Sequence, residues 1–440
     1  MEKKTVPFSE AIEQIGYGKF QKRLMWICGL GWAADAMEVL LIAFAVPAIG
    51  EEWGLSAVQK GFLSTAIFIG MLLGSIIWGR FSDVMGRKIG FIATVGVDSG
   101  FGFLSALAPT FPWLVILRSL TGFGVGGTLP VGYSIFSEYL PVEKRGQRLV
   151  ILESFWALGV IVAAGLAWLI VPSLGWRWLL AISAIPGLII FVIRRSVPES
   201  PRYLLSKGKT DEAMEVLRQV AEVNGVEINF NALKPLEKQT TKIRDILRPH
   251  YRKTTLLLWG VWFFISLGYY GVFTWLPNYF KSTGMETLPV YQNTFILALA
   301  QIPGYFTAAY LVEKVGRRMT LGLYLLGSGV FTYLFAAANS SSFLVFMGIW
   351  MSFFALGAWG ALYAFTPEIY PTPLRGTGMG SASAMTRFAG ILAPTIGGLL
   401  GGESFFVPLL VFSGAYILAS ASSFLLPVEM KGQELMDVVQ

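Results

Sequence analysis

Long apolar segments, separated by polar loops, recur along the whole sequence. A helix that crosses the hydrocarbon core of a membrane needs about 20 mostly apolar residues. Because an unpaired peptide group is costly in lipid, a crossing segment must be helical. The sequence therefore predicts an all-α membrane protein with twelve transmembrane helices, near residues 24–49, 57–79, 89–108, 112–137, 149–172, 177–195, 254–280, 289–312, 319–338, 342–366, 376–401 and 405–426.

The composition favours the same class of protein and excludes others. Only 14% of the residues are charged, against roughly 25% in soluble domains. The net charge of +7 does not indicate nucleic-acid binding, because the basic residues lie between the apolar segments. The single cysteine, Cys28, excludes an internal disulfide. One histidine, His250, and no metal-ligand cluster predict that the protein has no metal or cofactor and is not an enzyme.

The basic residues also predict the orientation in the membrane. If both termini are cytoplasmic, the outside loops contain only Lys60, Arg177 and Lys281, while Arg118 and Arg387 fall within helices. Nearly all other basic residues then lie on the cytoplasmic side, as the positive-inside tendency requires. We therefore expect a multi-pass protein of the plasma membrane, or of the inner membrane if bacterial, with both termini inside.

One long polar stretch, from Ser196 to Lys253, divides the chain. It predicts a six-helix bundle over residues 1–195, a cytoplasmic linker over residues 196–253 and a second six-helix bundle over residues 254–440. Within the linker, Thr210–Val223 is expected to form a short helix on the membrane surface. This segment has acids in its first turn, where the helix dipole favours them, and one apolar stripe.

The two bundles share a repeat with a period of 230 residues. The loop Asp83–Lys88 returns as Glu313–Arg318, and the acid, proline and arginine of Glu138–Gly146 return in Glu368–Gly376. Three features in one register, with Pro47 and Pro277 as the third, indicate a duplication. Duplicated halves of this kind occur in membrane transporters whose substrate site lies between the repeats.

The charges of the repeated loops are expected to form a gate. Opposite charges at the cytoplasmic ends of helices can hold the inner side shut and separate when it opens. The predicted gating residues are Asp83, Arg87, Glu138, Arg145, Glu313, Arg317, Glu368 and Arg375. Glu153, five residues past Arg148, is expected to form a salt bridge in the same gate rather than a substrate contact.

These motifs resemble those of the major facilitator superfamily, and the resemblance covers nearly the whole chain. Three segments carry it: the loop Gly79–Lys88, the helical stretch Arg118–Gly126 and the segment Pro198–Leu204. The resemblance implies the major facilitator fold and transport of a small molecule, but it does not imply a particular substrate. It also implies a part for Arg118 in proton coupling, with a structural ion pair as the alternative.

A closer resemblance is to bacterial niacin transporters, which are related to synaptic-vesicle glycoproteins and to organic anion and cation carriers. It rests on four places: Asp35–Glu38, Leu152–Trp156, Tyr269–Pro277 and Arg387. The chain departs from animal organic-ion carriers, because its loop Gly50–Ala57 is short. It departs from sugar porters in having Tyr269, Tyr270 and Trp275 where a glutamine-rich sugar-binding face is expected.

Six ionisable residues lie inside the predicted helices, where a charge is costly and each is a functional candidate. They are Asp35, Glu38, Asp98, Arg118, Glu153 and Arg387. Asp35 lies twelve residues past Arg23, roughly 18 Å along a helix and near mid-membrane. Glu38 shares its face, and two neighbouring carboxylates resist ionising together. We therefore expect Asp35 and Glu38 to couple transport to protons, unless they only form structural ion pairs. The sequence suggests no partner for Asp98.

Arg387 is the candidate for anion binding, because it lies at similar depth and a guanidinium grips a carboxylate through two hydrogen bonds. Aromatic walls around one fixed cation suit a flat aromatic acid. The predicted substrate-binding residues are Arg387, Asp35, Trp156, Tyr270, Trp275 and Tyr363. The sequence thus predicts a proton-coupled secondary transporter, expected to act as a monomer in the lipid bilayer, for a small organic anion such as nicotinate. The alternatives are an organic-cation transporter and a sensor that binds ligand without transporting it.

Overall fold

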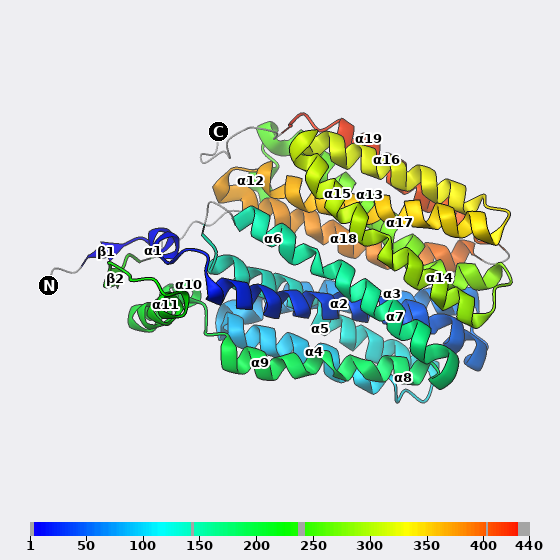
Figure 1. Ribbon diagram of the computed structural model, residues 1–440, viewed down its shortest axis with the longest axis horizontal. Coiled ribbons are helices and arrows are strands. Elements are labelled where there is room, and N and C mark those ends of the chain that lie inside the picture. Colours follow the sequence, from blue (N-terminus) through cyan, green and yellow to red (C-terminus); the bar gives the residue numbers. More distant parts are fainter. Residues whose placement is uncertain (1–3, 142–144, 236–242, 402–403, 430–440) are drawn as a thin grey trace.

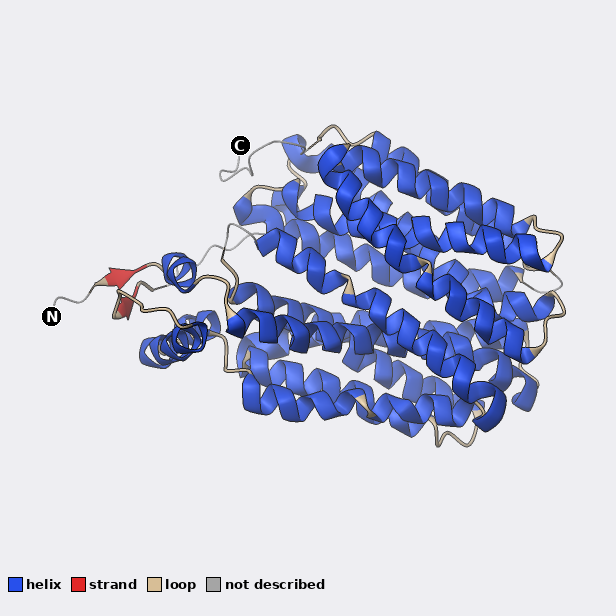
Figure 2. Ribbon diagram, viewed as in Figure 1, coloured by secondary structure: helices blue, strands red, loops and turns tan. Residues whose placement is uncertain are grey.

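The computed structural model describes residues 4–141, 145–235, 243–401 and 404–429, and nearly all of them are helical (Figure 2). Long helices lie side by side along the longest axis of the molecule (Figure 1). The first group comprises α2 (Lys19–Trp53), α3 (Ala57–Met85), α4 (Arg87–Ser105), α5 (Phe111–Glu138), α6 (Arg145–Glu153), α7 (Phe155–Leu174), α8 (Trp176–Ala181) and α9 (Ile189–Ser196), with short 3-10 turns η1 (Ile182–Ala184) and η2 (Pro186–Leu188).

The second group follows the linker. It comprises α12 (Ile243–Ile246), α13 (Pro249–Ser282), α14 (Thr287–Leu299), α15 (Gln301–Lys314), α16 (Arg317–Ala336), α17 (Ser341–Phe365), η3 (Thr366–Glu368), α18 (Thr372–Leu400) and α19 (Phe406–Phe424). Each of the twelve apolar segments predicted from the sequence overlaps helix in the structure. Ten helical stretches of the described chain are long and apolar enough to cross a membrane. Helices α4 and α18, which carry Asp98 and Arg387 among many small residues, are not among the ten.

Two predicted segments are helical but not continuous. The segment 149–172 breaks at Ser154, where the amide of Ser154 donates to the carbonyl of Ile151 and that of Ala157 donates to the carbonyl of Ser154. These three-residue spacings are a tightened turn directly after Glu153. The segment 177–195 breaks at η1 and η2, where Pro186 supplies no amide hydrogen.

A small layer covers one end of the bundle, which we call the linker end; the opposite end is the far end (Figure 1). The layer contains α1 (Phe8–Ile15), α10 (Pro201–Ser206), α11 (Thr210–Asn224) and the parallel pair β1 (Thr5–Val6) and β2 (Ala232–Leu233). The short helix predicted in the linker is thus confirmed as α11. Its stripe is buried against the first group, with members Met214, Leu217, Val220 and Ala221. Asn224 fastens the layer to α2, because its side chain accepts the Phe20 amide hydrogen at 2.9 Å.

The two helix groups touch closely at the far end. A Cβ atom on Gly61 of α3 would lie 2.8 Å from the Pro394 carbonyl and 3.0 Å from the Gly398 Cα atom of α18. Only glycine therefore permits this backbone contact. The hydroxyls of Thr65 and Thr395 meet at 3.0 Å one turn further in. An ion pair between Glu51 and Lys281 and a hydrogen bond from Tyr291 to the Phe44 carbonyl, at 2.8 Å, also join the groups.

Candidate functional site

A cavity of about 530 Å³ lies between the two helix groups. This is within the range of roughly 300–1,000 Å³ that is usual for small-molecule sites. Its walls come from α2, α6, α7, α13, α15, α17 and α18, and most of the lining side chains are aromatic. The lining residues are Trp32, Glu153, Trp156, Trp262, Tyr269, Tyr270, Tyr305, Leu356, Trp359, Tyr363, Ser383, Thr386 and Arg387.

The aromatic rings support one another at defined angles. The Trp156 indole donates to the Tyr269 hydroxyl at 3.2 Å, and that hydroxyl donates to the side-chain oxygen of Gln301 at 3.4 Å. The rings of Trp262 and Tyr363 meet edge to face at 5.1 Å. Such contacts hold large side chains in fixed positions, so the walls of the cavity are preorganised.

Arg387 and Glu153 are the charged residues among the described lining of the cavity. The Arg387 side chain is mostly buried, with 7% of the residue exposed. It interacts electrostatically with Asp35 and with Glu153. Among the residues that the structure describes, however, no carboxylate forms an ion pair with it. A guanidinium without a close carboxylate at a cavity wall is a site for an anion.

The structure brings together four of the six residues predicted to bind substrate. Arg387, Trp156, Tyr270 and Tyr363 line the cavity. Asp35 is buried behind the wall, with Thr128 and Glu38 as neighbours. Trp275 lies further along α13, where its indole donates to the Pro394 carbonyl at 3.1 Å and packs on Phe405. Trp275 is therefore placed at the contact between the groups rather than in the described lining.

Several lining residues were not predicted from the sequence. Trp32 lies three residues before Asp35, Trp359 lies four before Tyr363, and Ser383 lies four before Arg387. Each spacing puts the residue on the same helix face as a predicted one. This signal was available, whereas Tyr305 on α15 had no such neighbour.

The structure buries the same six ionisable residues that the sequence singled out. Glu38 and Arg118 form an ion pair at 3.2 Å, with both side chains fully buried. Arg118 also donates to the Thr121 hydroxyl at 2.8 Å and the Ser105 hydroxyl at 3.2 Å. Three helices, α2, α4 and α5, thus share one polar centre, which also contains Asp98.

Glu153 is not placed with the ion pairs of the loops. It lines the cavity beside the break at Ser154, with Trp32 and Arg387 as its polar neighbours. Because the break ends α6 at this residue, its carboxyl group is directed at the cavity instead of continuing along the helix surface. We therefore treat Glu153 as a cavity residue below.

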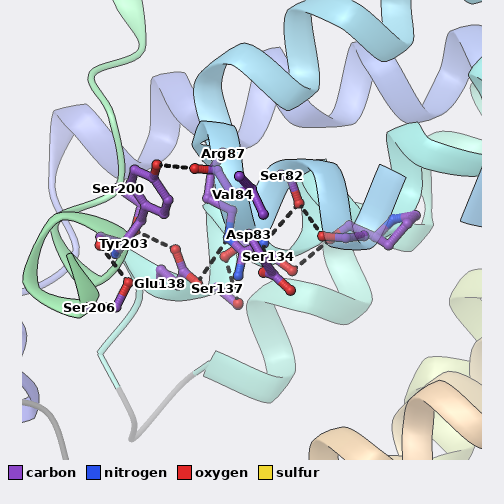
Figure 3. A network of polar contacts seen from close by, with 12 residues as sticks. Ser82, Asp83, Val84, Arg87, Ser134, Ser137, Glu138, Ser200, Tyr203 and Ser206 are labelled. Carbon is purple, nitrogen blue, oxygen red and sulfur yellow. Dashed lines mark hydrogen bonds and ion pairs between the residues drawn. The ribbon is translucent and has the colours of Figure 1, made fainter. Parts of the chain in front are cut away.

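The loop charges of the first group form a network at the linker end (Figure 3). Arg87 lies 2.5 Å from Asp83 and 3.5 Å from Glu138, and it donates to the Ser82 hydroxyl at 2.9 Å. Glu138 accepts a hydrogen bond from Ser200 of the linker. The network therefore connects α3, α4 and α5 with the end layer.

The second group repeats this arrangement. Arg317 lies 2.9 Å from Glu313 and 2.9 Å from Glu368. The two remaining gating candidates differ: Arg145 donates to the Leu140 carbonyl at 2.8 Å, and the side chain of Arg375 lies outside the part of the chain that the structure describes. The described pairs join helices within one group, not between groups.

Two glutamates that were not predicted complete the repeated loops. The Glu199 carboxylate accepts the amide hydrogens of Arg87 and Lys88 at 2.8 and 3.2 Å, at the start of α4. Glu429 accepts those of Arg317 and Arg318 at 2.9 and 3.1 Å, at the start of α16. A carboxylate at a helix N-terminus is favoured by the dipole and by the unpaired amides. The two glutamates are again 230 residues apart, a signal present in the sequence.

Each of these loops turns on a glycine. Gly86 and Gly316 have φ of 110° and 120°, a region that residues with a side chain rarely adopt. The turn directs the first amides of the next helix at Glu199 or Glu429. This explains why glycine precedes the arginine in both repeats.

Comparison with known proteins identifies the relatives. Residues 23–440 match the family described as "Sugar (and other) transporter". The chain is 37% identical to the niacin transporter of Acinetobacter baylyi, over 96% of this chain and 98% of that protein. It is 34% identical to the synaptic vesicle 2-related protein of Xenopus laevis, over 98% and 83% of the two chains. The xylose transporter XylE from E. coli, in a partially occluded inward-open conformation, superposes with a TM-score of 0.77 at 19% identity, over 94% of this chain and 100% of that chain.

Proposed function

Because the chain belongs to the sugar (and other) transporter family, we propose that it is a proton-coupled secondary transporter for a small aromatic carboxylate such as nicotinate. The chain is a multi-pass membrane transporter with the major facilitator fold. Its relative in Acinetobacter baylyi is named a niacin transporter, and the chemistry of the cavity agrees with an aromatic acid.

The observation that carries the proposal is the position of Arg387. It is a fixed cation at the wall of a cavity built from aromatic rings, and no carboxylate of the described chain pairs with it closely. A flat acid can place its ring between the aromatic walls and its carboxylate on the guanidinium. An uncharged analogue of the same shape loses the second interaction.

The buried charges provide a reason for proton coupling. Four buried carboxyl groups, Asp35, Glu38, Asp98 and Glu153, face the two buried guanidinium groups of Arg118 and Arg387. An unpaired buried carboxylate costs several kcal/mol, so part of this set must carry protons. When an anion binds Arg387, it adds one more negative charge and displaces Asp35 and Glu153 as partners. A proton must then enter with the anion to keep the centre neutral.

The proposed cycle alternates access to the cavity from the two sides. We propose that twelve crossings form two six-helix halves, 1–195 and 254–440, joined by the linker 196–253. Both termini and the linker end then lie in the cytoplasm of a plasma-membrane protein that acts as a monomer, in agreement with the basic residues. The glycine and threonine contacts of α3 with α18 at the far end then close the outer side.

Transport in liposomes tests the proposal. Purified protein should exchange labelled nicotinate for internal unlabelled nicotinate, because alternating access permits counterflow. An inward-directed proton gradient should drive its accumulation, with the membrane potential held at zero. Nicotinamide, the uncharged amide, should compete at least about tenfold more weakly, since a lost charged hydrogen bond is worth about 1.5–3 kcal/mol.

The same assay separates the alternatives. Glu153 in the cavity supports the organic-cation alternative, and competition by a quaternary ammonium ion in place of nicotinate would favour it. Ligand binding without any counterflow would indicate a sensor. Exchange of nicotinate that no proton gradient can drive uphill would leave the anion assignment and remove the coupling.

The loop network predicts a separate effect on the rate of the cycle. Asp83 is exposed but bonded to Arg87, and we propose that the network must re-form each time the inner side closes. Asp83→Asn should slow exchange roughly tenfold, about 1.4 kcal/mol in a barrier, while nicotinate affinity changes less than twofold. Asp211→Asn, an exposed acid of α11, is the control and should leave the rate unchanged. Equal rates for both variants would contradict the gating role.

A further inference from the structure

Asp98 lies at the end of a line of charged residues that leads away from the cavity. Arg387 at the cavity wall interacts with Asp35, and Asp35 interacts with Glu38. Asp98 on α4 interacts with Glu38, Asp35 and Arg118. It is buried, with 2% of the residue exposed, and it is not among the described lining residues of the cavity.

Close packing encloses the site around Asp98. A Cβ atom on Gly124 of α5 would lie 2.4 Å from the backbone nitrogen of Asp98. A Cβ atom on Gly102, one turn further along α4, would lie 2.6 Å from Ser183 and 3.2 Å from a carboxylate oxygen of Glu38. Glycines at both positions therefore let α4 lie directly against α5, η1 and the Glu38 carboxylate.

Three polar atoms of this enclosed site have no hydrogen-bond partner in the described part of the chain. They are Oδ1 of Asp98, Oε1 of Glu38 and Nη1 of Arg118. A buried polar atom without a partner is costly, by about 1–3 kcal/mol. The site thus contains one spare donor and two spare acceptors around a single guanidinium, an arrangement that can exist in two forms.

We propose that Asp98 and Glu38 share one transported proton, and that Arg118 pairs with whichever of the two is ionised. In the structure Arg118 pairs with Glu38, so the shared proton resides on Asp98. Moving it breaks the O–H bond at Asp98 and forms one at Glu38, while Arg118 changes its partner to Asp98. The number of charges and protons in the site stays constant, and the neutral Glu38 can pass its proton to Asp35.

This inference rests on the proposed proton coupling and adds a second proton to it. The faces around Asp98 contribute Glu38 and Asp35 from α2 and Arg118 from α5, while η1 contributes the Ser183 hydroxyl. The two-form site therefore involves no other charged group of the described neighbours. Asp98 is a proton-carrying residue that does not touch the substrate.

The experiment measures uphill uptake of labelled nicotinate into liposomes at a proton gradient of one pH unit and zero membrane potential. Each coupled proton contributes a factor of about ten to the accumulation ratio under these conditions. Asp98→Asn should lower the ratio about tenfold, and the directly measured proton-to-nicotinate ratio should fall by one. Counterflow of nicotinate should change less than twofold, because exchange needs no net proton movement. Ser99→Ala, the neighbouring buried residue, is the matched control and should keep the wild-type ratio.

Every outcome decides the proposal. An unchanged proton-to-nicotinate ratio in Asp98→Asn would overturn it. Asp98→Ser is the second variant, since it removes the carboxyl group without adding volume. If neither variant yields folded protein, Asp98 is an ionised structural partner of Arg118 and the proposal is wrong. If wild-type protein itself shows no uptake driven by the proton gradient, the proposed coupling fails first and this inference falls with it.

Discussion

Replacing Arg387 with alanine is expected to weaken nicotinate binding by about 2–5 kcal/mol, the range for removing one partner of a buried charge pair. This corresponds to a loss of about 30-fold to several thousand-fold in affinity. The physical reason is that the substrate carboxylate would enter a cavity of aromatic walls and a Glu153 carboxylate without any cation. Arg387→Lys should recover only part of the loss, since an ammonium lacks the planar fork of the guanidinium. Calorimetry on purified protein, normalised to the folded fraction, measures both variants.

Two controls separate binding from folding. Ser383→Ala, one turn before Arg387 and also at the cavity wall, should bind nicotinate within twofold of wild type. Nicotinamide should bind wild type and Arg387→Ala with similar affinity, since it has no carboxylate. If Arg387→Ala lowers the yield of folded protein but binds nicotinate normally, Arg387 is structural and the substrate need not be an anion.

The second large effect is expected from Asp35→Asn, which should abolish uphill accumulation driven by a proton gradient. Asp35 interacts with both Arg387 and Glu38, so it connects the anion site to the proton site. Without its carboxylate, nothing ties the binding of an anion at Arg387 to the uptake of a proton. Nicotinate should bind Asp35→Asn at least as tightly as wild type, because Arg387 loses an electrostatic competitor. Equilibration without accumulation is therefore the expected result in liposomes.

The variant tests coupling separately from fold and binding. Counterflow should persist, showing that the variant is folded and moves between its two states. Accumulation to the wild-type level would exclude Asp35 as the coupling residue and direct attention to Glu153, the other carboxyl group that interacts with Arg387.

Much of the fold could be predicted from hydropathy and from one numerical repeat. Apolar length located the helices because a membrane allows the backbone few other solutions. The period of 230 residues found the loops in which Arg87 and Arg317 bond their acids, since duplicated segments keep the contacts of a common turn. It would also have found Glu199 and Glu429 had the comparison been extended to the ends of α9 and α19.

The cavity was harder to predict than the helices. Arg387 and Asp35 were found because a buried charge is conspicuous in an apolar segment. Which aromatic rings face the cavity depends on the rotation of each helix against its neighbours, and tryptophans are also common at membrane interfaces. For this reason Trp275 was expected in the cavity and Trp262 was not, although both belong to α13. The break at Ser154, which directs Glu153 to the cavity, has no proline or glycine to announce it.

The attachment of the end layer has a practical consequence for imaging. Helix α11 packs with its apolar stripe on the first helix group, and Asn224 bonds to the start of α2. The opposite face of α11 is exposed, with Glu215, Arg218 and Glu222 on it. An antibody fragment bound to this face would be held in register with α2–α9 and not with α13–α19. In electron micrographs of so small a membrane protein it would mark the orientation of each particle, and the tilt of the unmarked group against it would distinguish the particles by conformation.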